Sequence, residues 1–211
     1  MNAEIKQQIL KYKIVSIVRG IPKDSLIPVM DALCRGGIRC VEITLNTPGA
    51  LQMIQQAKEA YGSRMLVGAG TVMDKPSAVN AVFAGADFIL SPVLDLEVIE
   101  VCHSYSRVAV PGIMTPTEAQ TAWKAGADII KLFPAASLGT DYVRNLLGPM
   151  SELDIMAVGG ISADNLTAFL ENGVCCFGIG GELVNKKLAA AHDFEAITQR
   201  ARTFVELVQQ Q

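Results

Sequence analysis

The chain has 211 residues, 50% of them hydrophobic, and a formal net charge of −3 from 18 basic and 21 acidic side chains. This length suits one domain with a full core, so we expect residues 1–211 to form a single domain. The composition excludes a disordered protein, and the charge balance argues against nucleic-acid and membrane partners. The polar N-terminal segment and the absence of a long uncharged apolar run predict a cytoplasmic protein.

Predicted strands and helices alternate along the chain after an amphipathic helix at 2–12. We expect strands at 14–19, 40–45, 65–69, 88–90, 108–110, 129–133, 154–158 and 175–179. We expect helices at 24–35, 49–61, 75–83, 94–103, 116–124, 141–147, 163–171 and 193–208. The strands are continuous apolar runs, which is typical of a parallel sheet covered by helices. The pattern predicts an α/β fold, a (β/α)8 TIM barrel with an N-terminal helix.

A doubly wound open sheet is the alternative fold. Its dinucleotide-binding members carry a G-x-G-x-x-G segment after a strand. The segment GAGTVM, after the third predicted strand, lacks the third glycine of that pattern. The sequence therefore favours the closed barrel.

One lysine lies inside an apolar strand. In the segment ADIIKLFPA, at 127–135, Lys131 shares a strand face with Ile129 and Phe133. If both faces of the strand are covered, desolvation disfavours the charged ammonium, and the neutral amine can attack a carbonyl. The alternative is that the side chain reaches the edge of the sheet and has no chemical role.

Polar residues at the C-terminal ends of the strands are candidates for an active site, because barrel active sites lie at that end. Glu42 lies inside the apolar strand CVEIT, where a carboxylate is costly unless it is paired or used. A closed barrel can place Glu42 opposite Lys131, and such a pair can move protons in imine chemistry. A structural ion pair between Glu42 and Arg19, on the adjacent strand, is the alternative.

Glycine pairs follow the last two predicted strands, Gly159 and Gly160 after the seventh, Gly180 and Gly181 after the eighth. In many barrels the loops at these two positions bind phosphate through backbone N–H groups. Glycines that only make tight turns are the alternative. The position of the pairs favours a phosphate site.

The two histidines, His103 and His192, lie far apart in the sequence. A histidine-rich metal site is therefore excluded. A carbonyl substrate can be activated by a metal ion or by imine formation with a lysine. The sequence thus favours the lysine, and we expect neither a metal nor another cofactor.

Six segments in fixed order, VEITLNTP, VGAGTV, ILSP, VPGIMTPTEA, IIKLFPA and AVGGI, resemble the 2-keto-3-deoxy-6-phosphogluconate (KDPG) and 4-hydroxy-2-oxoglutarate aldolases. The resemblance covers nearly the whole chain and is highly specific in combination. It implies a class I, lysine-imine aldolase on a (β/α)8 barrel, usually a homotrimer. The implied reaction splits the keto acid phosphate into pyruvate and glyceraldehyde 3-phosphate. Many members also act on 4-hydroxy-2-oxoglutarate, which yields pyruvate and glyoxylate.

The resemblance also implies a role for each matched residue. Lys131 would form the Schiff base with the C2 carbonyl. Glu42 would move protons to the departing water and from the C4 hydroxyl. The residues lining the pyruvyl pocket would be Arg19, Thr71, Pro92 and Phe133, with Thr71 near the carboxylate. The phosphate would be held by the backbone of Gly159, Gly160, Gly180 and Gly181.

The sequence departs from the family pattern near two of these positions. Asn46, which we expect to contact the substrate, stands where some members carry an arginine that binds a carboxylate. Gly181 replaces a serine of some members, and it is followed by Glu182, which would repel phosphate if its side chain pointed inward. The LNTP segment looks more like the 2-dehydro-3-deoxy-6-phosphogalactonate (KDPGal) aldolases, which differ in the stereochemistry at C4.

Two alternatives to a KDPG aldolase therefore stay open. The first is a KDPGal aldolase, which kinetics on the two C4 epimers would distinguish. The second belongs to another class: a barrel that has lost catalysis and only binds a phosphorylated metabolite. The retained Lys131 and Glu42 argue against this second alternative.

Overall fold

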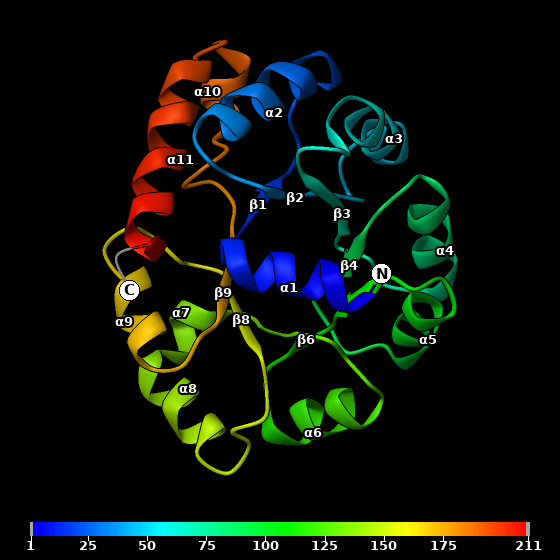
Figure 1. The fold of residues 1–211 in the computed structure, drawn as a ribbon, viewed down its shortest axis with the longest axis vertical. Helices are drawn as coiled ribbons and strands as arrows, with labels where there is room; N and C mark the ends of the chain where they lie inside the picture. The colour runs from blue at the N-terminus through cyan, green and yellow to red at the C-terminus, as the bar shows by residue number, and fades with distance from the viewer. Residues whose placement is uncertain (1, 210–211) are drawn as a thin grey trace.

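The computed structural model describes residues 2–209, and their strands form one parallel sheet surrounded by helices (Figure 1). The strands are β1 (Ile14–Val18), β2 (Cys40–Thr44), β3 (Leu66–Gly70), β4 (Phe88–Leu90), β5 (Val108–Val110), β6 (Gly112–Ile113), β7 (Ile130–Leu132), β8 (Ile155–Val158) and β9 (Cys176–Ile179). The helices are α1 (Asn2–Tyr12), α2 (Leu26–Arg35), α3 (Ala50–Tyr61), α4 (Lys75–Phe83), α5 (Leu96–Ser104), α6 (Pro116–Lys124), α7 (Ala135–Leu138), α8 (Thr140–Leu147), α9 (Leu166–Glu171), α10 (Lys186–Ala190) and α11 (Phe194–Gln209).

The sheet closes through the fifth predicted strand. Its strand order is β5-β4-β3-β2-β1-β9-β8-β7-β6, so β5 and β6 are the two ends. These two strands are consecutive pieces of one extended segment, divided at Pro111, which has no N–H to donate. The carbonyl of Pro111 still accepts a hydrogen bond from the N–H of Lys131 at 2.9 Å. The nine strands therefore form a nearly closed barrel, which confirms the (β/α)8 fold and rules out the open sheet.

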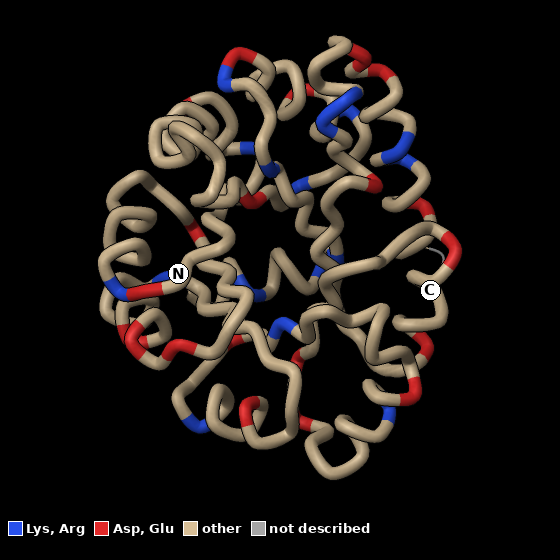
Figure 2. Tube along the Cα trace, turned by 180° about the vertical axis from the view of Figure 1, so that it is seen from behind, with Lys and Arg blue, Asp and Glu red and all other residues tan. Residues whose placement is uncertain are grey.

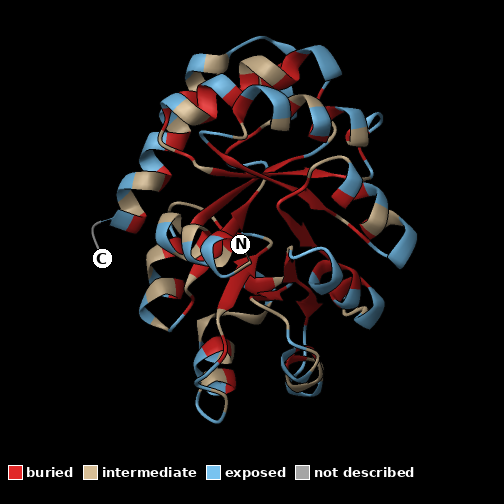
Figure 3. Cartoon of the chain, turned by 45° about the vertical axis from the view of Figure 1, so that its right-hand side comes forward, coloured by how far each residue is buried: buried red, intermediate tan, exposed pale blue. Residues whose placement is uncertain are grey.

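Side chains alternate between the inside and the outside of the barrel along each strand. Inward-facing residues from all parts of the sheet, among them Ile17, Phe88, Ile129 and Met156, form one buried cluster. The outward-facing residues, such as Ile130, pack under the helices in a second, larger cluster. Figure 3 shows this arrangement as buried strands inside a ring of helices whose outer faces are exposed. The predicted alternation around Lys131 is confirmed.

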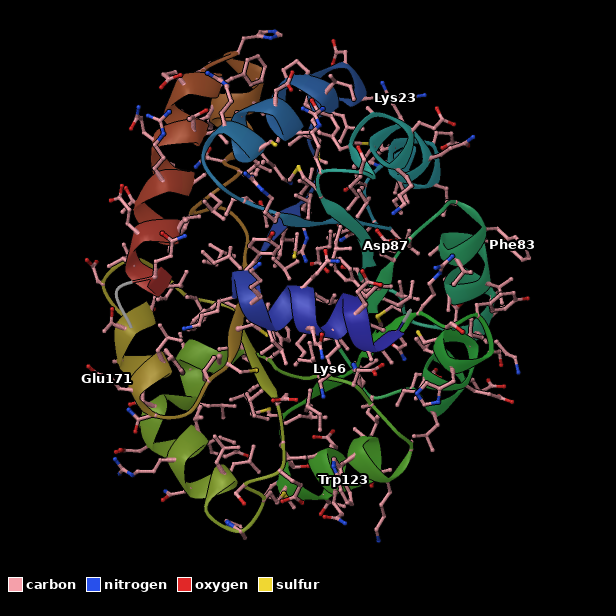
Figure 4. All side chains as sticks on the ribbon, viewed as in Figure 1. Lys6, Lys23, Phe83, Asp87, Trp123 and Glu171 are labelled. Atoms are coloured by element: carbon pink, nitrogen blue, oxygen red, sulfur yellow. The ribbon has the colours of Figure 1, made fainter. Side chains whose placement is uncertain are left out.

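Helix α1 covers the N-terminal end of the barrel. It runs across the middle of the barrel in Figure 1, and its Ile5 and Ile9 join the inner cluster. At its polar side Lys6, labelled in Figure 4, forms an ion pair of 2.7 Å with Asp154. The amide of Asn2 also donates to Asp128 at 3.3 Å. These contacts orient the helix so that its apolar face closes the barrel.

Local sequence signals explain where several helices begin. Asp74 and Asp95 accept hydrogen bonds from the first-turn N–H groups of α4 and α5. Thr115 and Glu118 form a reciprocal capping box at the start of α6. The short helix α7 was not predicted, and α9 begins at Leu166, three residues later than predicted.

The buried carboxylate of Asp87 links β3 and α3 to the start of β4. Asp87 accepts a hydrogen bond from the N–H of Val67 at 3.0 Å and lies 2.6 Å from the ammonium of Lys58. Both interactions offset the cost of burying the charge of Asp87, which begins the apolar segment that forms β4.

Among residues 2–209, none of the helices combines the length and the apolar character that a membrane span needs.

Candidate active site

Lys131 lies inside the barrel, in the middle of β7. Its side chain is only 5% exposed, and it pairs in register with Gly112 of β6 and Met156 of β8. Burial lowers the pKa of Lys131; Glu42 acts in the opposite direction, and Arg19 lowers it further. The ammonium nitrogen lies 5.1 Å from the centre of the Phe133 ring. This environment favours the neutral, nucleophilic amine.

Glu42 faces the same interior from β2. It is 1% exposed, and burial raises its pKa from 4.5 to about 7, although Lys131 and then Arg19 act to lower it. Its Oε2 atom has no hydrogen-bond partner among the described residues. No ion pair within 4.0 Å of the carboxylate occurs in residues 2–209, so the structural pair with Arg19, the alternative to a chemical role, does not form. The carboxyl is thus free to exchange a proton at neutral pH.

Gly70, at the end of β3, provides the space for Glu42. A Cβ atom at this position would lie 2.5 Å from Oε2 of Glu42. The next residue, Thr71, has a φ of +57°, a left-handed conformation that is strained for a β-branched side chain. Such strain is typical of functional sites. The end of β3 is therefore shaped around the carboxylate.

A cavity of about 310 Å³ opens at the C-terminal ends of β1, β8 and β9. Lys131 and Glu42 do not line it, and Phe133, whose ring centre lies 5.1 Å from the ammonium nitrogen of Lys131, does. The cavity unites several of the predicted residues, because its lining includes Arg19, Phe133 and both glycine pairs, 159–160 and 180–181. Figure 2, which views the side opposite α1, shows a few charged positions around the centre of the barrel, whereas most lie on the outer helices. The structure thus brings a cation, an aromatic ring and two glycine loops together.

The two glycine loops differ in backbone conformation. Gly159 and Gly160 have φ values of +94° and +74°, which residues with a side chain rarely adopt. A Cβ on Gly159 would lie 3.1 Å from the ring of Phe133, so glycine also lets that ring approach. Gly181 has open space around it, and a side chain there would meet no atom within 4 Å. The first loop requires glycine and the second does not.

Three predicted substrate contacts lie away from this cavity. Thr71 and Pro92 follow β3 and β4, and Gly112 allows the backbone of Pro92 to pass, because a Cβ there would collide with it. Asn46 lines a separate cavity of about 480 Å³ with Thr47, Gln52 and Asn80 among others. Asn46 thus lines a different cavity from Arg19 and Phe133, although the two strand ends are in contact, because the N–H of Gly20 donates to the hydroxyl of Thr47 at 2.9 Å. Its contact with substrate stays a prediction.

Sequence reasoning missed two residues of the cavity, Ile17 and Val158, which line it from β1 and β8. Alternation along β1 could have placed Ile17 on the same face as Arg19. Ser162, in the segment that follows the first glycine pair, also lines the cavity. Glu182 lines it as well and is exposed, so the predicted proximity of an acidic side chain to the glycine loops is present.

Comparison with known proteins agrees with this arrangement. A family model described as KDPG and KHG aldolase matches residues 5–200. The 2-dehydro-3-deoxy-6-phosphogalactonate aldolase of Escherichia coli is 35% identical and covers 93% of this chain and 94% of its own. The 2-dehydro-3-deoxy-phosphogluconate aldolase of Haemophilus influenzae is 30% identical and covers 97% of each chain. The chain is therefore a carbon–carbon lyase of the aldolase class.

A solved structure leads to the same class. It is described as a native KDPGal structure, is 33% identical, covers 93% of this chain and 94% of its own, and superposes with a TM-score of 0.88. The matched segment includes every strand of the barrel and both Lys131 and Glu42. The chain belongs to the KDPG and KHG aldolase family.

Proposed function

We propose that the chain is a class I aldolase that cleaves 2-dehydro-3-deoxy-6-phosphogluconate to pyruvate and glyceraldehyde 3-phosphate. The observation that carries this proposal is the pair of inward-facing groups on β2 and β7. Burial lowers the pKa of Lys131 and raises the pKa of Glu42 to about 7. An amine that is easily neutral and a carboxyl that titrates near neutrality are the two groups that imine chemistry needs.

Lys131 supplies the covalent step. Its neutral amine attacks the C2 carbonyl of the keto acid, and the resulting carbinolamine loses its hydroxyl as water to give an iminium ion. The C3–C4 bond then breaks, and its electrons flow to the iminium nitrogen, which leaves an enamine and the free aldehyde. Protonation of C3 and hydrolysis release pyruvate and regenerate the amine. The scheme needs no oxidant, reductant or cofactor.

Glu42 supplies the proton transfers. In its protonated form it donates to the carbinolamine hydroxyl as this leaves as water. The carboxylate so formed accepts the proton of the C4 hydroxyl as the C3–C4 bond breaks. Burial raises its pKa, and Oε2 has no hydrogen-bond partner among the described residues. No hydrogen bond from the protein to Oε2 therefore favours one protonation state. This supports a shuttle rather than a structural role.

The cavity supports separate binding of the two halves of the substrate. Phe133, which lines the cavity with Arg19, lies near Lys131, where the pyruvyl half would bind. The glycine pairs 159–160 and 180–181 line the same cavity, and their backbone N–H groups would hold the phosphate. Thr71, Pro92 and Asn46 complete the proposed substrate contacts from neighbouring strand ends.

A second substrate is favoured by a specific feature of the chain. The segment LNTP, with the uncharged Asn46 where some members carry an arginine, looks more like that of the KDPGal aldolases. Together with the 35% identity to the KDPGal aldolase of Escherichia coli, this supports the C4 epimer, 2-dehydro-3-deoxy-6-phosphogalactonate, as the alternative substrate. Cleavage of 4-hydroxy-2-oxoglutarate to pyruvate and glyoxylate is a third proposed reaction. The ratio of kcat/KM values on the two phosphorylated epimers decides which of them the site prefers.

The direct test of the mechanism is borohydride reduction in the presence of pyruvate, followed by intact mass and peptide mapping. We expect one stable adduct, on Lys131. The matched control is Lys124, an exposed lysine at the end of α6, which should stay unmodified. A folded protein that forms no adduct with excess pyruvate would refute the imine mechanism and favour a barrel that only binds its ligand.

We also propose that the protein is a cytoplasmic homotrimer. Several large apolar side chains are exposed on the helices and loops of one half of the barrel: Met73, Phe83, Val93, Leu96, Met114 and Trp123. Phe83, 73% exposed, projects outward from α4, and Trp123 does so from α6 (Figure 4). Exposed apolar groups of this size favour an interface between copies. Light scattering coupled to size-exclusion chromatography would report the mass.

A further inference from the structure

The loop that contains Gly159 and Gly160 is held by a side chain outside the motifs of the sequence analysis. Asn165 is half-buried and lies immediately before α9, where an asparagine ordinarily accepts a hydrogen bond from its own helix. Here it makes no such bond to α9. Its side chain turns back toward the preceding loop instead.

Both ends of the Asn165 carboxamide are used in that loop. Its Nδ2 donates to the carbonyl of Gly160 at 2.9 Å. Its Oδ1 accepts from the N–H of Ser162, also at 2.9 Å. The side chain therefore bridges the residues on either side of Ile161, and it fixes the turn between β8 and α9 at two points.

The carbonyl of Gly159 is also engaged. It accepts a hydrogen bond from the N–H of Ala136, in α7, at 3.0 Å. Among the described residues, by contrast, the N–H groups of Gly160 and Ile161 donate to no protein acceptor. Both residues line the 310 Å³ cavity. The carbonyl oxygens, which would repel an anion, are thus tied up, while N–H donors stay open to a ligand.

Glycine needs such support more than other residues. Gly159 and Gly160 hold φ values of +94° and +74°, yet glycine reaches many other conformations at little cost. Without an external bond, the peptide between residues 160 and 161 could rotate and turn its carbonyl into the cavity. The two bonds of Asn165 oppose this rotation.

We infer that Asn165 is a positioning residue for the phosphate group of the substrate. It acts through the carbonyl of Gly160 and the N–H of Ser162, and so holds the turn in the orientation that leaves the N–H groups of Gly160 and Ile161 open to the anion. This inference rests on the proposed function, in which the glycine pairs bind phosphate.

The test compares Asn165→Ala with Asn172→Ala. Asn172 lies at the other end of α9, and its side chain likewise donates to a backbone carbonyl, that of Ala168, at 2.8 Å. For each variant we would measure KM and kcat for the phosphorylated keto acid, the inhibition constant of inorganic phosphate, and the pyruvate concentration that gives half-maximal borohydride trapping.

We expect Asn165→Ala to raise both KM for the phosphorylated substrate and the inhibition constant of phosphate about tenfold, which is the effect of losing one hydrogen bond between the loop backbone and the phosphate. Trapping of pyruvate, which has no phosphate, should change less than about twofold. Asn165→Asp keeps the acceptor for Ser162 but not the donor to Gly160, so it should also lose phosphate affinity. Asn172→Ala should resemble the wild type.

Two other outcomes have distinct meanings. If the wild type binds phosphate but Asn165→Ala impairs phosphate binding and pyruvate trapping equally, or no more than Asn172→Ala does, the residue is merely structural and the inference is overturned. If the wild type itself traps pyruvate but shows no affinity for phosphate, the proposed phosphate site fails, and the inference fails with it. Because trapping and phosphate inhibition are measured on the same sample, a partly folded variant does not blur the comparison.

Discussion

At its N-terminal end the barrel is closed by apolar side chains of α1, whereas at its C-terminal end it holds an ionisable pair, strained backbone and glycine loops. Ile5 and Ile9 pack against the inner cluster, and the polar face of α1 is paired through Lys6. At the other end Glu42 keeps an oxygen without a partner, and Thr71 has a positive φ. Burial therefore stabilises the protein at the N-terminal end and serves chemistry at the C-terminal end.

The largest effect should come from Lys131→Met. Methionine fills a similar volume without a charge, so the variant should lose at least about 10³-fold in kcat, because the covalent route is removed. Its melting temperature should be unchanged or higher, since no ammonium needs to be desolvated. Steady-state kinetics and thermal unfolding test both points, with Lys124→Met as the exposed control. Turnover close to that of the wild type would contradict the mechanism.

The second largest loss of kcat should come from Glu42→Gln. It keeps the shape of the side chain but cannot exchange a proton, so kcat should fall roughly 10²–10⁴-fold. Pyruvate trapping on Lys131 should slow as well, because loss of water from the carbinolamine needs the acid. Glu171→Gln, on the exposed end of α9, is the matched control. An unchanged kcat in Glu42→Gln would make the carboxyl a structural group.

The N-terminal end should show the opposite behaviour. Ile9→Ala removes a fully buried side chain between α1 and the barrel, so the free energy of unfolding should fall by about 2–5 kcal/mol. The kcat of the folded fraction should stay within about twofold of the wild type. Gln7→Ala, on the exposed face of α1, should change neither quantity. A large loss of kcat in Ile9→Ala would show that the two ends are coupled.

The pH dependence of stability sharpens the comparison further. Burial raises the pKa of Glu42 from 4.5 to about 7, so the folded state keeps a proton that the unfolded state releases between these values. Stability must therefore fall as the pH rises through this window. Glu42→Gln does not lose stability in this way. Its free energy of unfolding should therefore rise by about 3 kcal/mol relative to that of the wild type as the pH goes from 4.5 to above 7. Urea unfolding of both proteins at pH 5 and at pH 8 measures this gain. If their free energies of unfolding differ by the same amount at both pH values, the pKa of Glu42 is not raised.

The architecture followed from local patterns. The continuous apolar strands and the alternation with helices predicted the barrel, and the capping residues Asp74, Asp95 and Thr115 fixed three helix starts. The division of the fifth strand at Pro111 was not predicted, because it depends on how the two ends of the sheet meet. The short helix α7 has only four residues, too few for a periodic pattern to reveal it.

The site was predictable to different degrees. Lys131 and Glu42 stood out because a charged residue inside an apolar strand is costly, and that cost can be seen in the sequence. Their convergence depends on closure of the barrel, which brings β2 and β7 to face each other across the interior. Asn165 escaped notice because its position suggests a helix cap, and only the structure shows that its carboxamide turns back to Gly160.

The fold class and the strand face that Lys131 shares with Ile129 and Phe133 followed from short-range periodicity, and the polar residues at the strand ends followed from the predicted strand bounds. Which of the predicted residues share a cavity is visible only in the folded chain. The fold places Arg19, Phe133 and the glycine pairs together and sets Asn46 in a different cavity. The physical reason is that distances between strands far apart in the chain are set by register and closure of the sheet, which no local pattern encodes.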